Sequence, residues 1–151
     1  MYAVRLWSIR HAGFWEWLYR HFERAYVAAG PALKRVGFAR LEAPAAAIER
    51  TVKGLLFDCQ MCGTCVLSST GMSCPMNCPK QMRNGPCGGV RANGHCEVKP
   101  EMLCVWVQAW EGSRRMQARD AITLLQPPVD HGGRERSSWL RVVRERLGEP
   151  M

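Results

Sequence analysis

All eight cysteines of this 151-residue chain fall between positions 59 and 104, and their spacing limits how the chain can fold. Residues 59–65, CQMCGTC, place three thiols at intervals of three. Few large aliphatic side chains lie between residues 74 and 96. Ordering a backbone costs about 1–2 kcal/mol per residue, so bound metal is the expected compensation in this segment. The candidate ligands are Cys59, Cys62, Cys65, Cys74, Cys78, Cys87, Cys96 and Cys104.

Three kinds of bond could use these thiols. A disulfide framework is typical of small secreted proteins, but the helical N-terminal third and the lack of a signal-peptide pattern disfavour it. Structural zinc usually takes two CxxC-like pairs, and only the first is clear here. Iron–sulfur cubanes fit better, because CxxCxxC supplies three ligands and a cysteine followed by proline often completes a set. The chain offers both Cys74-Pro75 and Cys78-Pro79. Two [4Fe-4S] clusters would use all eight cysteines, and one [4Fe-4S] cluster plus one zinc site stays open.

We expect Cys59, Cys62 and Cys65 to share one centre, whose fourth ligand the spacing leaves open. His95, next to Cys96, could replace a thiolate, but with eight thiols available we expect it to be a solvated turn histidine. No Ser/His/Asp set, paired carboxylates, phosphate loop, flavin fingerprint or nucleotide fingerprint is visible. The sequence therefore predicts no catalytic residues and no flavin on this chain.

The chain divides into three predicted sections. Residues 1–58 form an N-terminal helical segment, residues 59–110 a cysteine-rich metal-binding module, and residues 111–151 a C-terminal tail with a short helix that docks on a partner. The predicted fold class is mainly α with irregular metal-stabilised loops. It is a small cysteine-rich iron–sulfur, or zinc, module flanked by helices.

Helical periodicity locates the first two helices. Apolar residues recur at helical spacing over residues 14–29, and Gly30-Pro31 is expected to end that helix. A second helix is expected to begin near Pro44, in the first-turn position that proline favours, and to lead into Cys59. Its predicted apolar face carries Ile48, Val52, Leu55 and Leu56.

Two further helices are predicted after the cysteine loops. Residues 102–110, MLCVWVQAW, regain apolar character and suit a helix packed beside those loops. In the last helix, Ser137 or Ser138 is the expected N-cap and Gly148 the expected stop. Its predicted apolar face carries Trp139, Val142 and Val143.

The charge balance and the hydropathy pattern exclude some classes of protein. Twenty-one Lys and Arg against 13 Asp and Glu give a formal net charge of +8, much of it in arginine-bearing segments that suit solvated helix faces. Nucleic acid is therefore not the expected partner. No stretch approaches the roughly 20 apolar residues of a membrane span. We expect a cytoplasmic protein, in which clustered thiols stay reduced and bind metal.

Specific strings resemble a known family. The string KGLLFDCQMCGTCVLSSTGMSCPMNCPKQMRNGPCGG, followed by HCEVKP and CVWVQAW, closely resembles the methylenetetrahydrofolate reductase C-terminal-like family. The tail elements QPPVD and SSWL are also similar to that family. The resemblance covers about residues 50–140 and leaves residues 1–45 unanchored.

The resemblance implies an accessory role. In this family the cysteine-rich module is fused to, or accompanies, a flavin-dependent methylenetetrahydrofolate reductase whose barrel binds FMN or FAD and folate. The small subunit carries iron–sulfur, with or without zinc, and relays electrons toward that flavin; a further electron-donor protein is a second implied partner. All eight cysteines lie within matching motifs. The resemblance also assigns the shaping of the loop around Cys87 to Arg83, Asn84, Gly85, Pro86, Gly88 and Gly89.

Two functions from different classes stay open. The first is an accessory iron–sulfur subunit of a folate-linked oxidoreductase, and the alternative is a zinc-stapled structural or nucleic-acid-binding module. Aromatic residues are favoured interface anchors, so the six tryptophans are candidates for partner docking or for the protein's own core. They are Trp7, Trp15, Trp17, Trp106, Trp110 and Trp139.

Overall fold

The computed structural model describes residues 2–149, and this part of the chain is mainly helical, as predicted. Its extended pairing is confined, within those residues, to two isolated bridges. That metal stabilises the loops stays a prediction. The α-helices are α1 (Tyr2–Arg10), α2 (Ala12–Ala28), α3 (Gly30–Val36), α4 (Phe38–Phe57), α5 (Val105–Ser113) and α6 (Ser138–Leu147). The 3-10 helices are η1 (Leu67–Ser69), η2 (Pro75–Asn77), η3 (Arg119–Thr123) and η4 (His131–Gly133).

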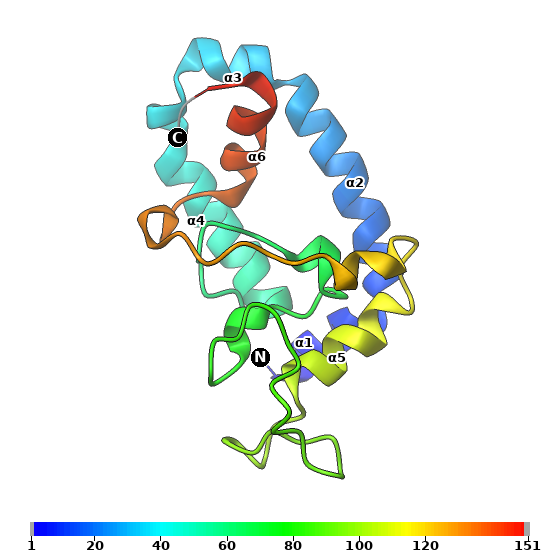
Figure 1. Ribbon diagram of the computed structural model, residues 1–151. Helices are drawn as coiled ribbons and strands as arrows, with labels where there is room; N and C mark the ends of the chain where they lie inside the picture. The colour runs from blue at the N-terminus through cyan, green and yellow to red at the C-terminus, as the bar shows by residue number, and fades with distance from the viewer. Residues whose placement is uncertain (1, 150–151) are drawn as a thin grey trace.

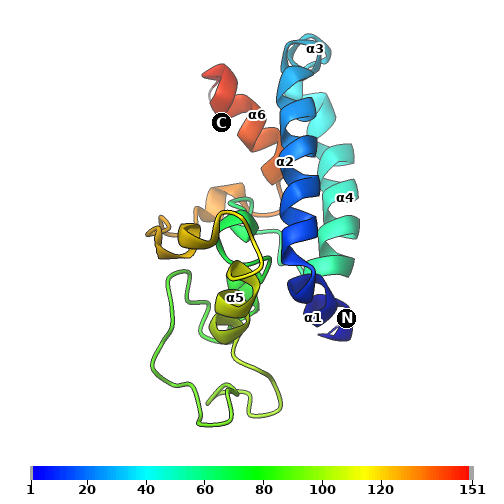
Figure 2. The same cartoon turned by 90° about the vertical axis from the view of Figure 1, so that its right-hand side faces the viewer.

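The long helices α2 and α4 lie to one side of the cysteine loops. Helices α2 and α4 run in opposite directions and are joined at one end by α3, and α6 packs against both (Figure 1). In the side view, α1, α2 and α4 form one layer, and α5 with the loops before it lies on the other side (Figure 2). Among residues 2–149, no helix combines the length and apolar character of a membrane-spanning segment. The cysteine loops pack against one end of the long helices α2 and α4.

The boundaries of α2 and α4 follow from glycine and proline. Helix α2 ends at Ala28, as the Gly30-Pro31 signal predicts, and the short helix α3 then begins at Gly30 with Pro31 in its first turn. The predicted start near Pro44 is wrong: α4 begins at Phe38, after Gly37 turns the chain with a φ of 98°. Pro44 lies inside this helix, where its missing N–H removes one intrahelical hydrogen bond.

The buried face of α4 differs from the predicted apolar face. Ile48 and Leu55 are 59% and 57% exposed, and Val52 is 41% exposed. The residues that α4 buries recur at helical spacing on a neighbouring face, and two of them are charged: Ala46, Glu49, Lys53 and Phe57. Of the predicted face, Leu56 is partly buried and packs against the core cluster that contains Phe57, and the other three residues are exposed.

The last two helices agree more closely with the sequence. Helix α5 begins directly after Cys104 rather than at residue 102. At the start of α6, Ser137 Oγ accepts the N–H of Leu140 at 3.3 Å, and at its end Gly148 adopts a left-handed φ of 67°, so both predicted caps are confirmed. Leu140 and Val143 are fully buried, while Trp139 is partly buried. This packing fixes the first turn of α6 beside α4.

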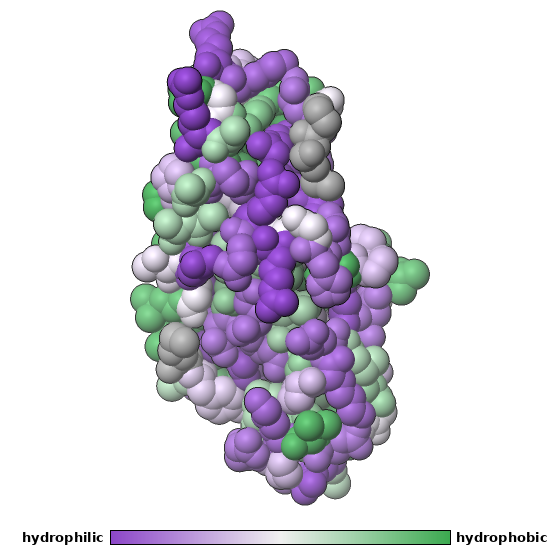
Figure 3. Space-filling model, turned by 90° about the vertical axis from the view of Figure 1, so that its left-hand side faces the viewer, coloured by the Kyte–Doolittle hydropathy of each residue, from purple (hydrophilic) through white to green (hydrophobic). Residues whose placement is uncertain are grey.

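Two hydrophobic clusters join the loops to the helices. The larger one takes its members from α2, α4, the cysteine loop and the segment after α5: Ala12, Phe57, Leu67, Met72, Cys74 and Met116. The smaller one centres on Cys104, Trp106 and Ala109. On the opposite side of the molecule from the view in Figure 2, polar side chains cover most of the middle of the surface (Figure 3). Cys74 and Cys104 are thus members of the two hydrophobic clusters.

Candidate metal centre

The end of α4 shapes the CQMCGTC loop. Asp58 closes the helix in a left-handed conformation with a φ of 54°, and the Cys59 N–H bonds back to Lys53 O at 3.3 Å. The loop turns again at Met61 and Gly63, whose φ values are 47° and 75°. A Cβ at Gly63 would overlap a backbone carbonyl of η4, so the loop can pack there only with glycine. Successive turns of this kind keep the three thiols of the motif on one small loop.

Four cysteines line a single pocket at this loop. The three thiols of the motif, Cys59, Cys62 and Cys65, share it with Cys74, which is 7% exposed. Pro75, next to Cys74, also lines this pocket and begins η2. The structure thus places Cys59, Cys62 and Cys65 at one pocket, and Cys74 lines it with them; that these thiols share a metal centre stays a prediction.

The thiols of this pocket influence each other's protonation. Burial raises the pKa of Cys59 to about 11 and that of Cys74 to about 12. The other thiols of the pocket add to the shift at Cys74, because negative charges close together oppose ionisation. With their raised pKa values, Cys59 and Cys74 keep their protons at neutral pH, and metal binding to these two thiols would release them.

The donor set suits a four-thiolate centre, although the thiols are not arranged around one point. Within residues 2–149, no three Cys, His, Asp or Glu side chains converge on a position for a single ion. The space in the pocket is about 20 Å³, close to the volume of one water-sized group. A zinc ion would therefore require the thiols to move inward, and a cubane would require the loop to move outward.

A buried ion pair closes one side of the pocket. Lys53 and Glu49 are 4% and 2% exposed and both line it. Lys53 Nζ donates to Glu49 Oε1 at 2.7 Å and to Ser138 Oγ at 2.8 Å, and Glu49 also accepts from the Trp139 N–H. Burial by itself lowers the pKa of Lys53, but Cys65 and Glu49 outweigh it and raise the pKa above its ordinary value. A cation therefore stands beside the Cys65 sulfur.

The remaining four cysteines lie outside the lining of this pocket. Cys96 and Cys104 lie on a loop that folds back on itself, with the Cys96 N–H bonded to Met102 O and the Cys104 N–H to a carbonyl before Cys96. Cys87 and Cys96 both lie near enough to Lys80 to raise its pKa, after the larger effect of its hydrogen bond to a glutamate. Cys78 is buried and begins the turn that follows η2. All eight cysteines of the chain are free thiols in the structure.

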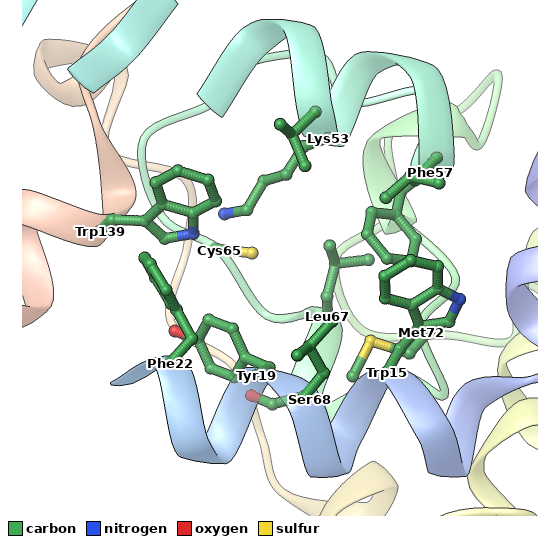
Figure 4. A pocket seen from close by; sticks show the side chains of 13 residues that line it. Trp15, Tyr19, Phe22, Lys53, Phe57, Cys65, Leu67, Ser68, Met72 and Trp139 are labelled. Atoms are coloured by element: carbon green, nitrogen blue, oxygen red, sulfur yellow. The ribbon is translucent and has the colours of Figure 1, made fainter. Parts of the chain in front are cut away.

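Cys65 also opens onto an apolar cavity of about 250 Å³. Among the four cysteines of the pocket it is the exposed one. Figure 4 shows its sulfur near the Lys53 ammonium, with Trp139 on one side and Tyr19 and Phe22 of α2 on the other. Burial, and after it Cys65, raises the pKa of Tyr19. The cavity thus links the thiols to the space between α2 and α4.

Exposed apolar side chains surround the mouth of this cavity. Leu18 of α2 and Val52 of α4 line it and are 40% and 41% exposed. Trp17, on the same helix as Leu18, is 54% exposed and stacks on Phe14. Of the other predicted anchors, Trp7 and Trp110 are also largely exposed, Trp106 is buried in the smaller cluster, and Trp15 and Trp139 are partly buried in the cavity wall. The tryptophans therefore divide between core and surface.

The loop that carries Cys87 is held by the residues predicted to shape it. Asn84 exchanges two hydrogen bonds with the backbone of Gln126, each 2.8 Å long. A Cβ at Gly85 would overlap the Trp106 ring, whose Nε1 donates to Met82 O at 3.1 Å. This loop is therefore anchored on α5 and on the segment before η4.

His95 is the predicted turn histidine. Its Nδ1 lies 3.2 Å from Asn93 O, and its backbone N–H bonds to Asn93 Oδ1 at 3.1 Å. These local contacts hold the ring in its turn, and the structure gives it no place in the pocket of Cys59 and Cys74.

Sequence reasoning missed the charged residues around the pocket. Glu49, Lys53 and Arg83 all line it, yet the first two were assigned no role and Arg83 was assigned only to the neighbouring loop. A signal was present for the first pair. Lys53 follows Glu49 by four residues and precedes Phe57 by four, so the three share one face of a helix that leads directly into Cys59.

Comparison with known proteins identifies the family. The sequence model of the family described as methylene-tetrahydrofolate reductase C terminal matches residues 38–132, which include all eight cysteines. No curated protein and no solved structure matches the chain. The family match covers more than half of the chain, so the protein belongs to the methylene-tetrahydrofolate reductase C-terminal family.

Proposed function

We propose that this chain is an accessory iron–sulfur subunit that delivers electrons to a separate flavin-dependent methylenetetrahydrofolate reductase-like enzyme. Membership of the family supports the link to folate metabolism. The observation that carries the electron-transfer role is the pocket shared by Cys59, Cys62, Cys65 and Cys74. Four thiols with a buried cation beside them are the donor set of a cluster site.

In this proposal the four cysteines of the pocket hold one [4Fe-4S] cluster, which supplies one-electron transfer when bound. Lys53 places positive charge beside Cys65, and the larger hydrophobic cluster keeps water from Cys74. The second centre takes Cys78, Cys87, Cys96 and Cys104, as a second [4Fe-4S] cluster or, alternatively, as zinc. We assign it by elimination, because all four lie outside the pocket of the first.

In this proposal, electrons leave the first centre through Cys65. It is the exposed thiol of the first centre and faces the apolar cavity whose mouth carries Leu18 and Val52. Electron transfer becomes fast only at short distances, so the flavoprotein has to dock over this mouth. Exposed aromatic side chains next to it, such as Trp17, are the kind of anchor that protein interfaces favour.

Mixing experiments test the relay. Affinity purification from the native cell should recover a flavin-containing barrel protein, and the isolated chain should not reduce methylenetetrahydrofolate. Adding the metal-loaded chain should let a reductant bleach the partner's flavin. Cys62→Ala should abolish this transfer, and Val36→Ala, at an exposed position of α3 outside the cavity, should leave it unchanged.

Two results would overturn the proposal. One is a stable monomer with no flavoprotein bound, together with full reductase activity in its absence. The other is a colourless zinc protein that binds nucleic acid in a salt-dependent manner, because that result supports the zinc-stapled alternative.

A further inference from the structure

Arg83 is a buried cation that forms no ion pair with another side chain among residues 2–149. Its side chain belongs to the loop before Cys87, and the residue is 7% exposed. Nη2 donates to Thr64 O at 2.9 Å. Nε and Nη1 are buried, and neither has a hydrogen-bond acceptor among residues 2–149. Two of the three guanidinium nitrogens are therefore shielded from water without a hydrogen-bond acceptor among the described residues.

This arrangement is costly unless an anion completes it. A buried donor without a partner costs about 1–3 kcal/mol, and a charged one costs more. Buried charges in proteins are almost always paired or bound to a ligand. The contrast within this structure is clear, because Lys53, the other buried cation of the pocket, has both Glu49 and Ser138 as acceptors. Arg83 lacks an equivalent pair of acceptors.

The position of Arg83 shows which anion would complete it. Arg83 lines the same pocket as Cys59, Cys62, Cys65 and Cys74. The carbonyl that it binds belongs to Thr64, between two of those cysteines, so its guanidinium is held against the thiol loop. Four thiolates outweigh the positive charge of a cubane core, so a loaded centre here is anionic and becomes more so on reduction.

We propose that Arg83 is the internal counter-charge of the first centre, and that its Nε–H and Nη1–H donate to the thiolates of that centre. This inference rests on the proposed function, since it needs a four-thiolate centre in the pocket. Arg83 acts as a positioning residue. Its charge favours the reduced state and so raises the reduction potential, because positive charge and hydrogen bonds near the sulfurs set that potential.

Arginine suits this role better than lysine. Its planar fork can bind a backbone carbonyl with one nitrogen and direct two further donors elsewhere, whereas an ammonium is a compact point charge. In this chain the fork ties the CQMCGTC loop to the loop before Cys87. Replacement by lysine should therefore keep the positive charge near the centre but lose the simultaneous hydrogen bonds to the Thr64 carbonyl and to the thiolates.

The test compares Arg83→Gln and Arg83→Lys with wild-type protein and with Arg144→Gln. Arg144 is a suitable control because its side chain is 11% exposed and it lines a different pocket. Each protein is reconstituted anaerobically, its iron and sulfide are measured, and the potentials are determined by redox titration followed by electron paramagnetic resonance. We expect Arg83→Gln to lower the equilibrium constant for reduction of one centre about tenfold. For one electron this corresponds to a reduction potential that is lower by about 59 mV. Arg83→Lys should give a smaller shift, and Arg144→Gln none.

Each alternative outcome is informative. If Arg83→Gln holds wild-type iron with unchanged potentials and spectra, the inference is wrong while the proposed function stands. If wild-type protein binds no iron and sulfide, the proposed function itself fails. If both Arg83 variants lose iron from one centre but keep their helical content, the need for the guanidinium at that centre is supported. Loss of helical content in both would contradict it, because the guanidinium would then serve the fold.

Discussion

Replacing Glu49 by alanine should destabilise the protein strongly, because the substitution leaves the buried Lys53 ammonium without its carboxylate partner. Glu49 is 2% exposed and accepts hydrogen bonds from Lys53 Nζ at 2.7 Å, from Ser137 Oγ at 2.8 Å and from Ser138 Oγ at 2.5 Å. Removing it leaves Lys53, which is 4% exposed, without its carboxylate. It also removes the acceptor that holds the first turn of α6 against α4.

The size of the effect follows from this burial. Breaking a buried ion pair by deleting one partner costs about 3–5 kcal/mol, since the remaining charge is left uncompensated. The neighbouring ion pair between Arg50 and Glu135 provides the contrast. Its side chains are 57% and 58% exposed, so its loss should cost no more than about 1 kcal/mol. Two charged residues adjacent on α4 are therefore expected to differ several-fold in their contribution to stability.

Urea unfolding of the anaerobically loaded proteins measures the difference. Helical circular dichroism gives the transition midpoint for wild type, Glu49→Ala and the control Arg50→Ala, each at equal iron content. Adding Lys53→Met to Glu49→Ala should recover part of the loss, because it removes the unpaired charge. Amide exchange should report faster opening of residues 137–140 in Glu49→Ala.

Two results would refute the reasoning. A loss below about 1 kcal/mol for Glu49→Ala would place the pair among exposed ion pairs. A double variant less stable than Glu49→Ala would show that Lys53 stabilises the fold without its carboxylate.

Three further substitutions test other parts of the structure. Gly63→Ala should lower iron loading, since a Cβ there overlaps the backbone of η4 at a φ of 75°; loading equal to wild type would contradict the close packing of that loop. Because burial raises the pKa of Tyr19, the unfolded chain releases this proton first, and stability should fall as pH rises above about 10. Tyr19→Phe should make that fall shallower in unfolding measurements at successive pH values, and an unchanged slope would argue against it. Val52→Asp should weaken capture of the flavoprotein without changing iron content, while Val36→Asp, at a somewhat more exposed site on α3, should leave capture unchanged; equal effects would remove the cavity mouth from the interface.

The sequence predicted those features that depend on local chemistry. The spacing of CQMCGTC predicted that its three cysteines lie close together, and they line one pocket; the caps of α6 were evident from Ser137 and Gly148. The presence of Cys74 in the same pocket was not predictable, because it depends on how the loop after Cys65 returns to bury Cys74 in the core.

The face of α4 was misjudged for a similar reason. Hydrophobic periodicity favoured Ile48 and Val52, but the buried positions are Glu49 and Lys53. Their burial depends on acceptors and donors in the first turn of α6, nearly ninety residues away in the sequence. Periodicity cannot detect a polar pair that is satisfied only in the folded state. Arg83 Nε and Nη1, which are buried without an acceptor among residues 2–149, could likewise be identified only from the folded loops.

Metal and sulfide analysis of anaerobically purified protein tests the central claim most directly. The account predicts about eight iron and about eight acid-labile sulfide per chain, as two four-thiolate cubanes require. About half of that iron and sulfide with one zinc would assign zinc to the second centre. Zinc without sulfide, after careful anaerobic reconstitution, would contradict the account.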